Sequence, residues 1–147
     1  MFHLSTKSRY GLRALIELAA LSKVEPVSLK KLAINQDISK KYLENIFRML
    51  QKDGIIRSIR GAHGGYLLAE PPEKISVYRV LKAIDGPVNL LDCISDTSLC
   101  GKARECPTRP LWTELEQTIV DFLESKTLKD LLEKFRKAKK SFRGMYI

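Results

Sequence analysis

Apolar positions along the first fifty residues recur with the spacing of α-helices. Between residues 8 and 22 they fall at i, i+3, i+4 and i+7, so a helix would gather them on one face. Thr6 or Ser8 can cap the start of this helix, and Pro26 follows its end. The stripe consists of Leu12, Leu15, Ile16 and Ala19.

Two more helices are predicted before the pattern changes. Ser28 can cap a short helix, which the polar and turn-prone sequence NQD then ends. Ser39 can cap the third helix, and Gly54 stands where a C-cap glycine belongs. The inward positions of these two helices are Leu29, Leu32 and Ala33, followed by Leu43, Ile46, Phe47 and Leu50.

A shorter period follows Gly54 and predicts β-structure. The runs IIRSIR and GYLLAE are strand-like, GAHG separates them, and a proline pair ends the second run. Gly61, Gly64 and Gly65 allow the positive φ that a tight connection needs. Three helices followed by a two-stranded ribbon make a winged helix-turn-helix, a fold that puts one helix into the major groove of DNA.

The rest of the sequence predicts three helical segments around one long loop, so the chain should be mainly α-helical with a small β-ribbon. The first segment starts at Ser76, the second at Pro110, and the third at Thr127, which forms a capping pair with Asp130. The loop over residues 87–109 is too long for a simple connection, so we expect something to organise it. The second segment carries an apolar stripe of Trp112, Leu115, Ile119 and Phe122.

Charge is distributed unevenly along the 147 residues. The net charge is +9, and residues 1–80 hold 14 Lys and Arg against 7 Asp and Glu, whereas residues 81–147 hold 12 against 10. The alternatives for the basic half are an ordinary solvated surface and a surface that binds a polyanion such as nucleic acid. The length suits one compact domain, or a small domain with a helical arm.

The sequence disfavours several classes of protein. No apolar run approaches the roughly 18–20 residues of a membrane span, and the N-terminus lacks the cleavage site of a signal peptide. We therefore expect a cytosolic chain with reduced thiols and no membrane partner. No nucleotide-binding glycine fingerprint, HExxH site or nucleophile motif is present, and GAHGG is too short for a phosphate loop, so we expect no enzyme.

The predicted third helix and the ribbon carry side chains that could read DNA. On the helix face opposite the core, Asn can pair with adenine, Glu can accept from cytosine, and Lys can reach guanine or phosphate. The ribbon adds cations at a narrow tip that could enter the minor groove. The alternatives are a solvated helix face and a plain hairpin with exposed charges. The candidates are Lys40, Lys41, Tyr42, Glu44, Asn45 and Arg48 on the helix, with Arg57, Arg60 and His63 on the ribbon.

All three cysteines of the chain lie in the long loop, at Cys93, Cys100 and Cys106. Their spacing lacks the close C-x2-C pair that is typical of zinc sites. Three thiolates that leave one coordination position open favour an iron–sulfur cluster completed by a foreign ligand. The alternatives are a zinc site, a metal-free thiol switch and three unrelated surface cysteines.

With these residues in view, the chain resembles the IscR- and NsrR-like winged-helix transcription regulators of the Rrf-two family over about residues 4–135. The most specific stretches are LSTKSRYGLRAL, ISKKYLENIFRMLQKDGIIRSIRGAHGGYLL and LLDC…C…CPTRPLW…TLKDLL. The resemblance implies a bacterial, homodimeric regulator that binds a pseudo-palindromic operator under the control of an iron–sulfur cluster. It also implies that long C-terminal helices of two subunits cross near the cluster loop and the DNA-reading domain.

This resemblance divides the chain into three parts. Residues 1–86 would form the winged helix-turn-helix DNA-binding domain, residues 87–109 the cysteine cluster loop, and residues 110–147 the C-terminal dimerisation helices. The apolar stripe after Pro110 fits such a dimer helix, and it would also fit packing onto its own domain.

Position by position, the resemblance assigns roles to residues of this chain. Tyr42, Glu44 and Asn45 match base-reading residues, and Arg60 matches a wing arginine that enters the minor groove. The three cysteines match the cluster ligands. The positions near phosphates or base edges are Ser28, Ser39 and Lys41.

Two positions depart from the family pattern. Arg109 stands where IscR-type sequences carry a histidine ligand, and a guanidinium has no lone pair to donate. Arg9 stands where NsrR-type sequences carry an aspartate. The cluster type, [2Fe–2S] or [4Fe–4S], and the fourth ligand therefore stay open, and water or a small thiol could complete the site. The candidate side chains are His3, Asp92, Asp96 and Glu105.

Rival functions follow from the same residues. One is a regulator of the same fold that uses its cysteines as a thiol switch or as a zinc site. The other is an electron-transfer protein or an enzyme built around the cluster, which would show redox activity without salt-sensitive DNA binding.

Overall fold

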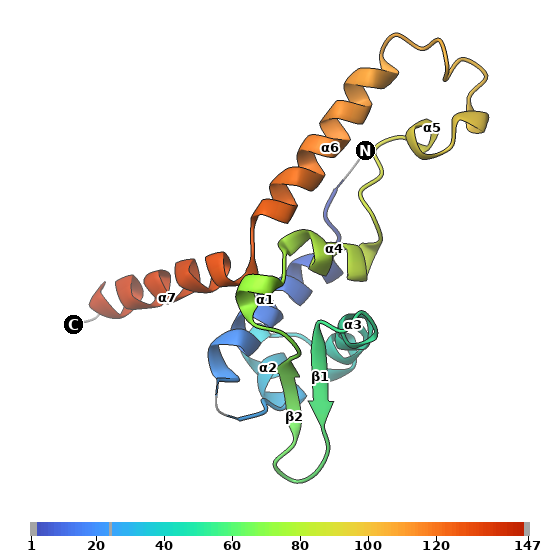
Figure 1. Ribbon diagram of the computed structural model, residues 1–147. Helices are drawn as coiled ribbons and strands as arrows, with labels where there is room; N and C mark the ends of the chain where they lie inside the picture. Colours follow the sequence, from blue (N-terminus) through green and yellow to red (C-terminus); the bar gives the residue numbers. More distant parts are fainter. Residues whose placement is uncertain (1–2, 24, 146–147) are drawn as a thin grey trace.

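A computed structural model describes residues 3–23 and 25–145, with side chains as far as Lys140. The predicted fold, mainly α-helical with a small β-ribbon, is confirmed, and a long helix projects from the main body (Figure 1). Residues 1, 2, 24, 146 and 147 of the predicted domain ranges lie outside this description. The elements are α1 (Thr6–Leu21), α2 (Leu29–Gln36), α3 (Lys40–Lys52), β1 (Ile56–Ile59), β2 (Gly65–Leu68), η1 (Pro72–Lys74), α4 (Val77–Asp85), α5 (Asp92–Ser95), η2 (Thr97–Leu99), α6 (Arg109–Ser125) and α7 (Leu128–Met145).

One apolar core joins α1, α2, α3, the ribbon and α4. The inward positions predicted for α3 are fully buried, and burial of a side chain such as Phe47 contributes about 1.5–3 kcal/mol relative to exposure. In α1 the prediction holds for Leu15 and Ala19, whereas Leu12 and Ile16 are only half-buried. The predicted order of three helices and a ribbon is the winged helix-turn-helix arrangement.

Serine side chains start the helices of this body. Ser28 and Ser39 cap α2 and α3 as predicted, because each hydroxyl oxygen accepts a hydrogen bond from the amide three residues later. The predicted caps of the first helix, Thr6 and Ser8, are wrong. Ser5 caps α1, and its Oγ accepts from the Ser8 amide at 3.0 Å. The prediction failed because α1 begins at Thr6, before its apolar stripe, and the N-cap is the residue that precedes the first helical residue.

The wing is the antiparallel ribbon of β1 and β2, in which Ile56 pairs with Leu68. Val27 extends it by a short third segment. The Val27 amide donates to the Tyr66 carbonyl at 3.0 Å, and the Tyr66 amide donates to the Val27 carbonyl at 2.8 Å. A Cβ atom at Gly65 would lie 2.4 Å from the Val27 carbonyl oxygen, so only glycine permits this approach.

The glycines of the wing serve two different needs. Gly61 and Gly65 have positive φ angles of 115° and 152°, as predicted. Gly64 is not among the residues with positive φ, so that part of the prediction is wrong. Glycine is needed there for space, because a Cβ atom would lie 2.1 Å from the Ile59 carbonyl oxygen.

The two C-terminal helices leave the body in different directions (Figure 1). Leu128 and Leu132 bury α7 against the core, and the Leu128 amide donates to the Ile75 carbonyl at 3.0 Å. The predicted capping pair is present, because the Thr127 amide donates to Asp130 at 2.9 Å. Helix α6, by contrast, contains no buried residue. In the described part of the chain, no helix has both the length and the apolar character needed to cross a membrane.

Candidate nucleic-acid interface and cysteine loop

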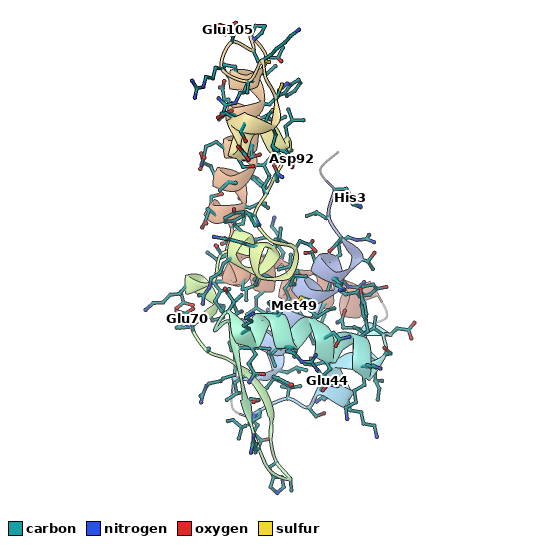
Figure 2. All side chains as sticks on the ribbon, turned by 90° about the vertical axis from the view of Figure 1, so that its right-hand side faces the viewer. His3, Glu44, Met49, Glu70, Asp92 and Glu105 are labelled. Carbon is teal, nitrogen blue, oxygen red and sulfur yellow. The ribbon has the colours of Figure 1, made fainter. Side chains whose placement is uncertain are left out.

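The outer face of α3 presents the predicted DNA-reading side chains to solvent. Lys40, Lys41, Glu44, Asn45 and Arg48 are all exposed, and Figure 2 shows Glu44 pointing away from the core on the side where the wing projects. Arg48 donates from Nη1 to Asn45 Oδ1 at 3.5 Å, and its Nη2 lies 3.9 Å from Glu44 Oε1. Such exposed contacts are weak, so these side chains are free to rearrange against a DNA groove.

Tyr42 differs from the other candidates on α3 because it is half-buried. Its ring meets Tyr10 of α1 edge to face, with 6.3 Å between ring centroids. The Arg13 guanidinium lies over the Tyr10 ring at 5.3 Å. Helix α1 therefore positions Tyr42 at the edge of the reading face.

The two candidate serines lie at helix N-termini. Ser28 Oγ accepts from the Lys31 amide at 3.2 Å, and Ser39 Oγ accepts from the Tyr42 amide at 3.0 Å. Each hydroxyl keeps its own hydrogen for donation, and both serines are exposed. A helix N-terminus with a free donor is suited to a phosphate group.

The wing carries its three candidates, Arg57, Arg60 and His63, as exposed side chains. Its root is fixed to α3 in two ways. Tyr66 meets Phe47 edge to face at 5.1 Å between centroids, and Gln51 Nε2 donates to Ser58 Oγ at 3.2 Å. Helix α3 and the wing therefore form one rigid reading surface.

Sequence reasoning missed Arg79 of α4, which holds the ends of α3 and β2. Its Nη2 donates to the Asp53 carbonyl at 3.0 Å, its Nε lies 3.4 Å from Asp53 Oδ2, and its Nη1 pairs with Glu70. The hydrogen bond to Glu70, more than any other contact, raises the pKa of Arg79. No local motif could have revealed this contact, because the partners are 26 and 9 residues away.

The segment over residues 92–108, which contains the three cysteines, lies at the far end of α6 from α3 and the wing (Figure 1). Cys93 and Cys106 are half-buried, and Cys100 is exposed. The donor set fits a thiolate-ligated group by its chemistry. Among the residues described, however, no three Cys, His, Asp or Glu side chains are grouped closely enough to hold a metal ion. The sequence identified the donors and not their arrangement.

Hydrogen bonds organise this loop. The Thr108 hydroxyl, 3.3 Å from Cys106 Sγ, is the main cause that lowers the pKa of Cys106, followed by nearby backbone amides and the Arg109 charge. Arg109 itself donates to the carbonyls of Cys93 and Ile94 at 3.1 and 3.3 Å. Where IscR-type sequences carry a histidine ligand, this chain therefore has an arginine that holds the loop backbone in place by hydrogen bonds.

Two of the proposed fourth ligands already have hydrogen-bond partners. Asp92 Oδ1 accepts from Asn89 at 2.8 Å, and Asp96 Oδ1 accepts from the Ser98 hydroxyl at 2.6 Å. The Ser98 hydroxyl, and then the Ser98 amide, lower the pKa of Asp96. Glu105 is exposed at the tip of the loop, far from Glu44 in Figure 2.

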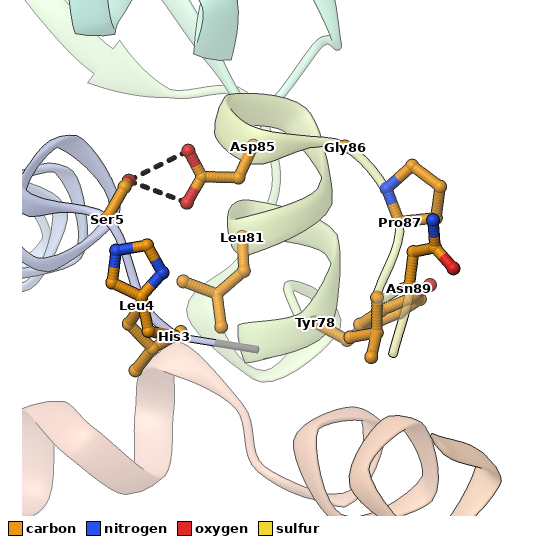
Figure 3. A pocket seen from close by; sticks show the side chains of 10 residues that line it. His3, Leu4, Ser5, Tyr78, Leu81, Asp85, Gly86, Pro87 and Asn89 are labelled. Carbon is orange, nitrogen blue, oxygen red and sulfur yellow. Dashed lines mark hydrogen bonds between the residues drawn. The ribbon is translucent and has the colours of Figure 1, made fainter. Parts of the chain in front are cut away.

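The remaining candidate, His3, lines a cavity of about 370 Å³ between the N-terminal segment and α4 (Figure 3). Asp85 borders this cavity and accepts hydrogen bonds from the hydroxyls of Ser5 and Ser8, at 2.6 Å in each case. None of the cysteines lines the cavity. Within the described residues, His3 therefore lines the same cavity as Asp85 and lies apart from the thiols.

The comparison with known families agrees with this geometry. The sequence profile of the Rrf2 family, described as an iron-dependent transcriptional regulator, matches residues 4–134. The chain belongs to the Rrf2 family. It is therefore a DNA-binding transcription regulator, and the expectation that it is not an enzyme is confirmed by its Rrf2 relatives.

Those Rrf2 relatives include proteins with different names and similar folds. The protein rrf2 of Nitratidesulfovibrio vulgaris is 40% identical over 129 residues, which cover 88% of this chain and 86% of that protein. The transcriptional regulator IscR of Pectobacterium atrosepticum is 39% identical over 129 residues, with 88% and 78% covered. The structure of CymR, the global cysteine regulator of B. subtilis, has a TM-score of 0.73 at 36% identity and covers 91% of this chain and 98% of its own.

Proposed function

We propose that this Rrf2-family regulator binds a pseudo-palindromic operator as a homodimer, and that an iron–sulfur cluster held by Cys93, Cys100 and Cys106 controls its affinity. The observation that carries the proposal is the common side on which α3 and the wing present their polar and cationic residues. The resemblance to IscR-type regulators and the grouping of all three thiols in one loop support the control by a cluster.

In the proposed complex, α3 lies in the major groove and the wing tip in the minor groove. Glu44 and Asn45 would contact base edges, and Arg60 would enter the minor groove, where the negative potential is enhanced. The hydroxyls of Ser28 and Ser39 would donate to phosphates. Cations at the edges of both elements would add contacts that weaken as salt rises. These cations are Lys40, Lys41, Arg48 and Arg57.

The dimer would place two copies of α3 on successive turns of the duplex. Helix α6 supports this assembly, because it projects from the body and exposes an apolar stripe. Within one chain, the cysteine loop lies at the opposite end of the molecule from α3. The loop could therefore come near a reading surface only through the partner subunit.

Control would act through the contacts that tie the loop to α6. When bound, the cluster would supply a redox-active centre that responds to iron–sulfur status, oxidant or nitric oxide. Arg109 holds the Cys93 carbonyl, and Glu116 of α6 accepts from the Leu90 amide at 2.9 Å. A change in the order of the loop would therefore shift α6 and, through it, the spacing of the two reading domains.

A thiol switch is the second candidate for the control step. Two observations favour it: the lowered pKa of Cys106 makes its thiolate more abundant, and one solved relative, CymR of Staphylococcus aureus, is described in an oxidized form. A zinc site held by the same thiols is the remaining variant of this candidate.

A binding experiment tests the DNA-reading part. We expect Arg60→Ala to weaken binding to an operator selected in vitro about tenfold, because the wing loses its minor-groove cation. Gel-shift titrations at matched salt measure the change. Lys82→Ala is the control, since it removes one exposed positive charge from α4. Equal affinities of Arg60→Ala and the wild type would contradict the role of the wing.

Anaerobic purification tests the cluster. We expect visible absorbance with iron and sulfide in the wild type, and loss of all three in Cys93→Ala, because one thiolate ligand is missing. Ser95→Ala, a neighbouring change on α5, should keep them. A wild type without iron or sulfide would favour the thiol switch or zinc, and unchanged iron in Cys93→Ala would rule out ligation by this cysteine.

A further inference from the structure

A basic groove lies beside the wing, on the side away from α3. It has a volume of about 470 Å³ and is lined by residues of α1, both strands, η1 and α7. Figure 1 shows α7 and α3 on opposite sides of the wing, and α3 lies in front of α7 in Figure 2. We call it the basic groove because four cations line it, namely Lys23, Arg57, Lys129 and Arg136.

The charges of the basic groove are not balanced from within. Among the described residues that line it, Glu73 supplies the only carboxylate beside the four cations. In the part of the chain with described side chains, none of the four cations forms an ion pair. Like charges held within about 10 Å of one another repel, so an anion in the groove would relieve this repulsion. The groove is therefore suited to an anionic ligand.

Helix α7 extends the positive surface beyond the groove. Residues 128–140 hold six Lys and Arg against two Asp and Glu. Lys140 follows Arg136 by four residues, which places it on the same side of the helix. Cations that come from several elements and continue along a helix suit a long polyanion better than a compact one.

The wing connects this surface to the proposed operator contact. Arg57 precedes Arg60 by three residues, a distance of about 10 Å along the strand. Duplex DNA carries one negative charge per roughly 1.7 Å of its axis. A duplex that contacts α3 and the wing tip, and then continues past the wing, would bring its backbone alongside the basic groove.

We propose that the basic groove, extended along α7 by Lys140, binds the phosphate backbone of DNA that flanks the operator beyond the wing. The inference rests on the proposed DNA-reading function and deepens it. The groove lengthens the bound segment without reading bases, because Lys and Arg contacts to phosphates carry no sequence information.

Duplexes of two lengths test this inference. The same selected operator is prepared as a short duplex that ends at the wing contact and as a long duplex with mixed-sequence flanks. We expect Lys129→Gln/Arg136→Gln to weaken binding to the long duplex about tenfold and to leave binding to the short duplex unchanged. On the long duplex, the slope of log K against the logarithm of the salt concentration should become smaller in magnitude by about two per bound subunit.

Lys134→Gln/Lys137→Gln is the matched control, because it removes the same charge from α7 at positions that do not line the groove. It should bind both duplexes as the wild type does. Hydroxyl-radical protection of the flanks should be lost only in the groove variant.

Three results would overturn the inference. If Lys129→Gln/Arg136→Gln bound each duplex with the same affinity as the wild type, the inference would be refuted, and the DNA-reading function would be unaffected. If Lys129→Gln/Arg136→Gln and Lys134→Gln/Lys137→Gln weakened binding to the long duplex equally, DNA would be attracted by the overall positive charge of α7 and not by the groove. Tight binding of inorganic pyrophosphate to the groove, without an effect of duplex length, would indicate a small-anion site. A wild type that binds no duplex at all would refute the DNA-reading function itself.

Discussion

At the scale of single residues, Arg79 shows how a side chain outside the reading surface can position it. The guanidinium contacts Asp53 at the end of α3 and Glu70 just after β2, and thereby joins both reading elements to α4. Each ion pair is partly exposed and by itself contributes about 0.2–1 kcal/mol to stability. Their shared guanidinium gives them a second effect, because it fixes the angle of the wing against α3.

We therefore expect Arg79→Met to weaken operator binding and to reduce the further loss caused by Arg60→Ala. A wing that is no longer held in place benefits less from its minor-groove cation, so the double-mutant cycle should give a coupling of about 0.5–1 kcal/mol. Fluorescence titrations of all four proteins measure it, and Lys82→Met replaces Arg79→Met in the control cycle. Additive losses would show that Arg79 affects stability alone.

At the scale of elements, the sequence predicted those parts whose signals are local. The apolar period of α3, the capping hydroxyls of Ser28 and Ser39, and the Thr127–Asp130 pair each act within one or two helical turns, and the structure contains them. The segment at Val27 that extends the wing was not predicted, because its partner Tyr66 is distant in the chain.

The cysteine loop was the least predictable element for the same reason. Its composition revealed the three thiols, but neither α5 nor η2 has an apolar period that could be recognised. The contacts that organise it join distant residues, such as Arg109 to the Cys93 carbonyl and Glu116 to the Leu90 amide. The candidate donors could be named from the sequence, whereas their positions depend on tertiary contacts.

At the scale of the whole molecule, α6 is the helix whose exposed apolar stripe is not covered by any part of the same chain that the structure describes. It is 17 residues long, contains no buried residue and projects away from the body (Figure 1). Leu115 is 43% exposed and Phe122 is 61% exposed. Helices in proteins are stabilised mostly by the packing of an apolar face rather than by intrinsic propensity, so the exposed apolar stripe of α6 needs a partner surface. A second copy of α6 would supply a matching stripe in a two-fold dimer.

We expect Leu115→Glu/Phe122→Glu to convert the proposed dimer into a folded monomer, because charge on the stripe opposes its burial while the core of the body is untouched. Sedimentation should then give the chain mass of 16.7 kDa instead of twice that value, with an unchanged helical circular dichroism signal. Thr113→Glu/Gln117→Glu places the same charges on the other side of α6 and should stay dimeric. If the stripe variant remained a dimer, the subunits would have to meet through another surface, and the proposed link from the cysteine loop through α6 to operator spacing would fail with it.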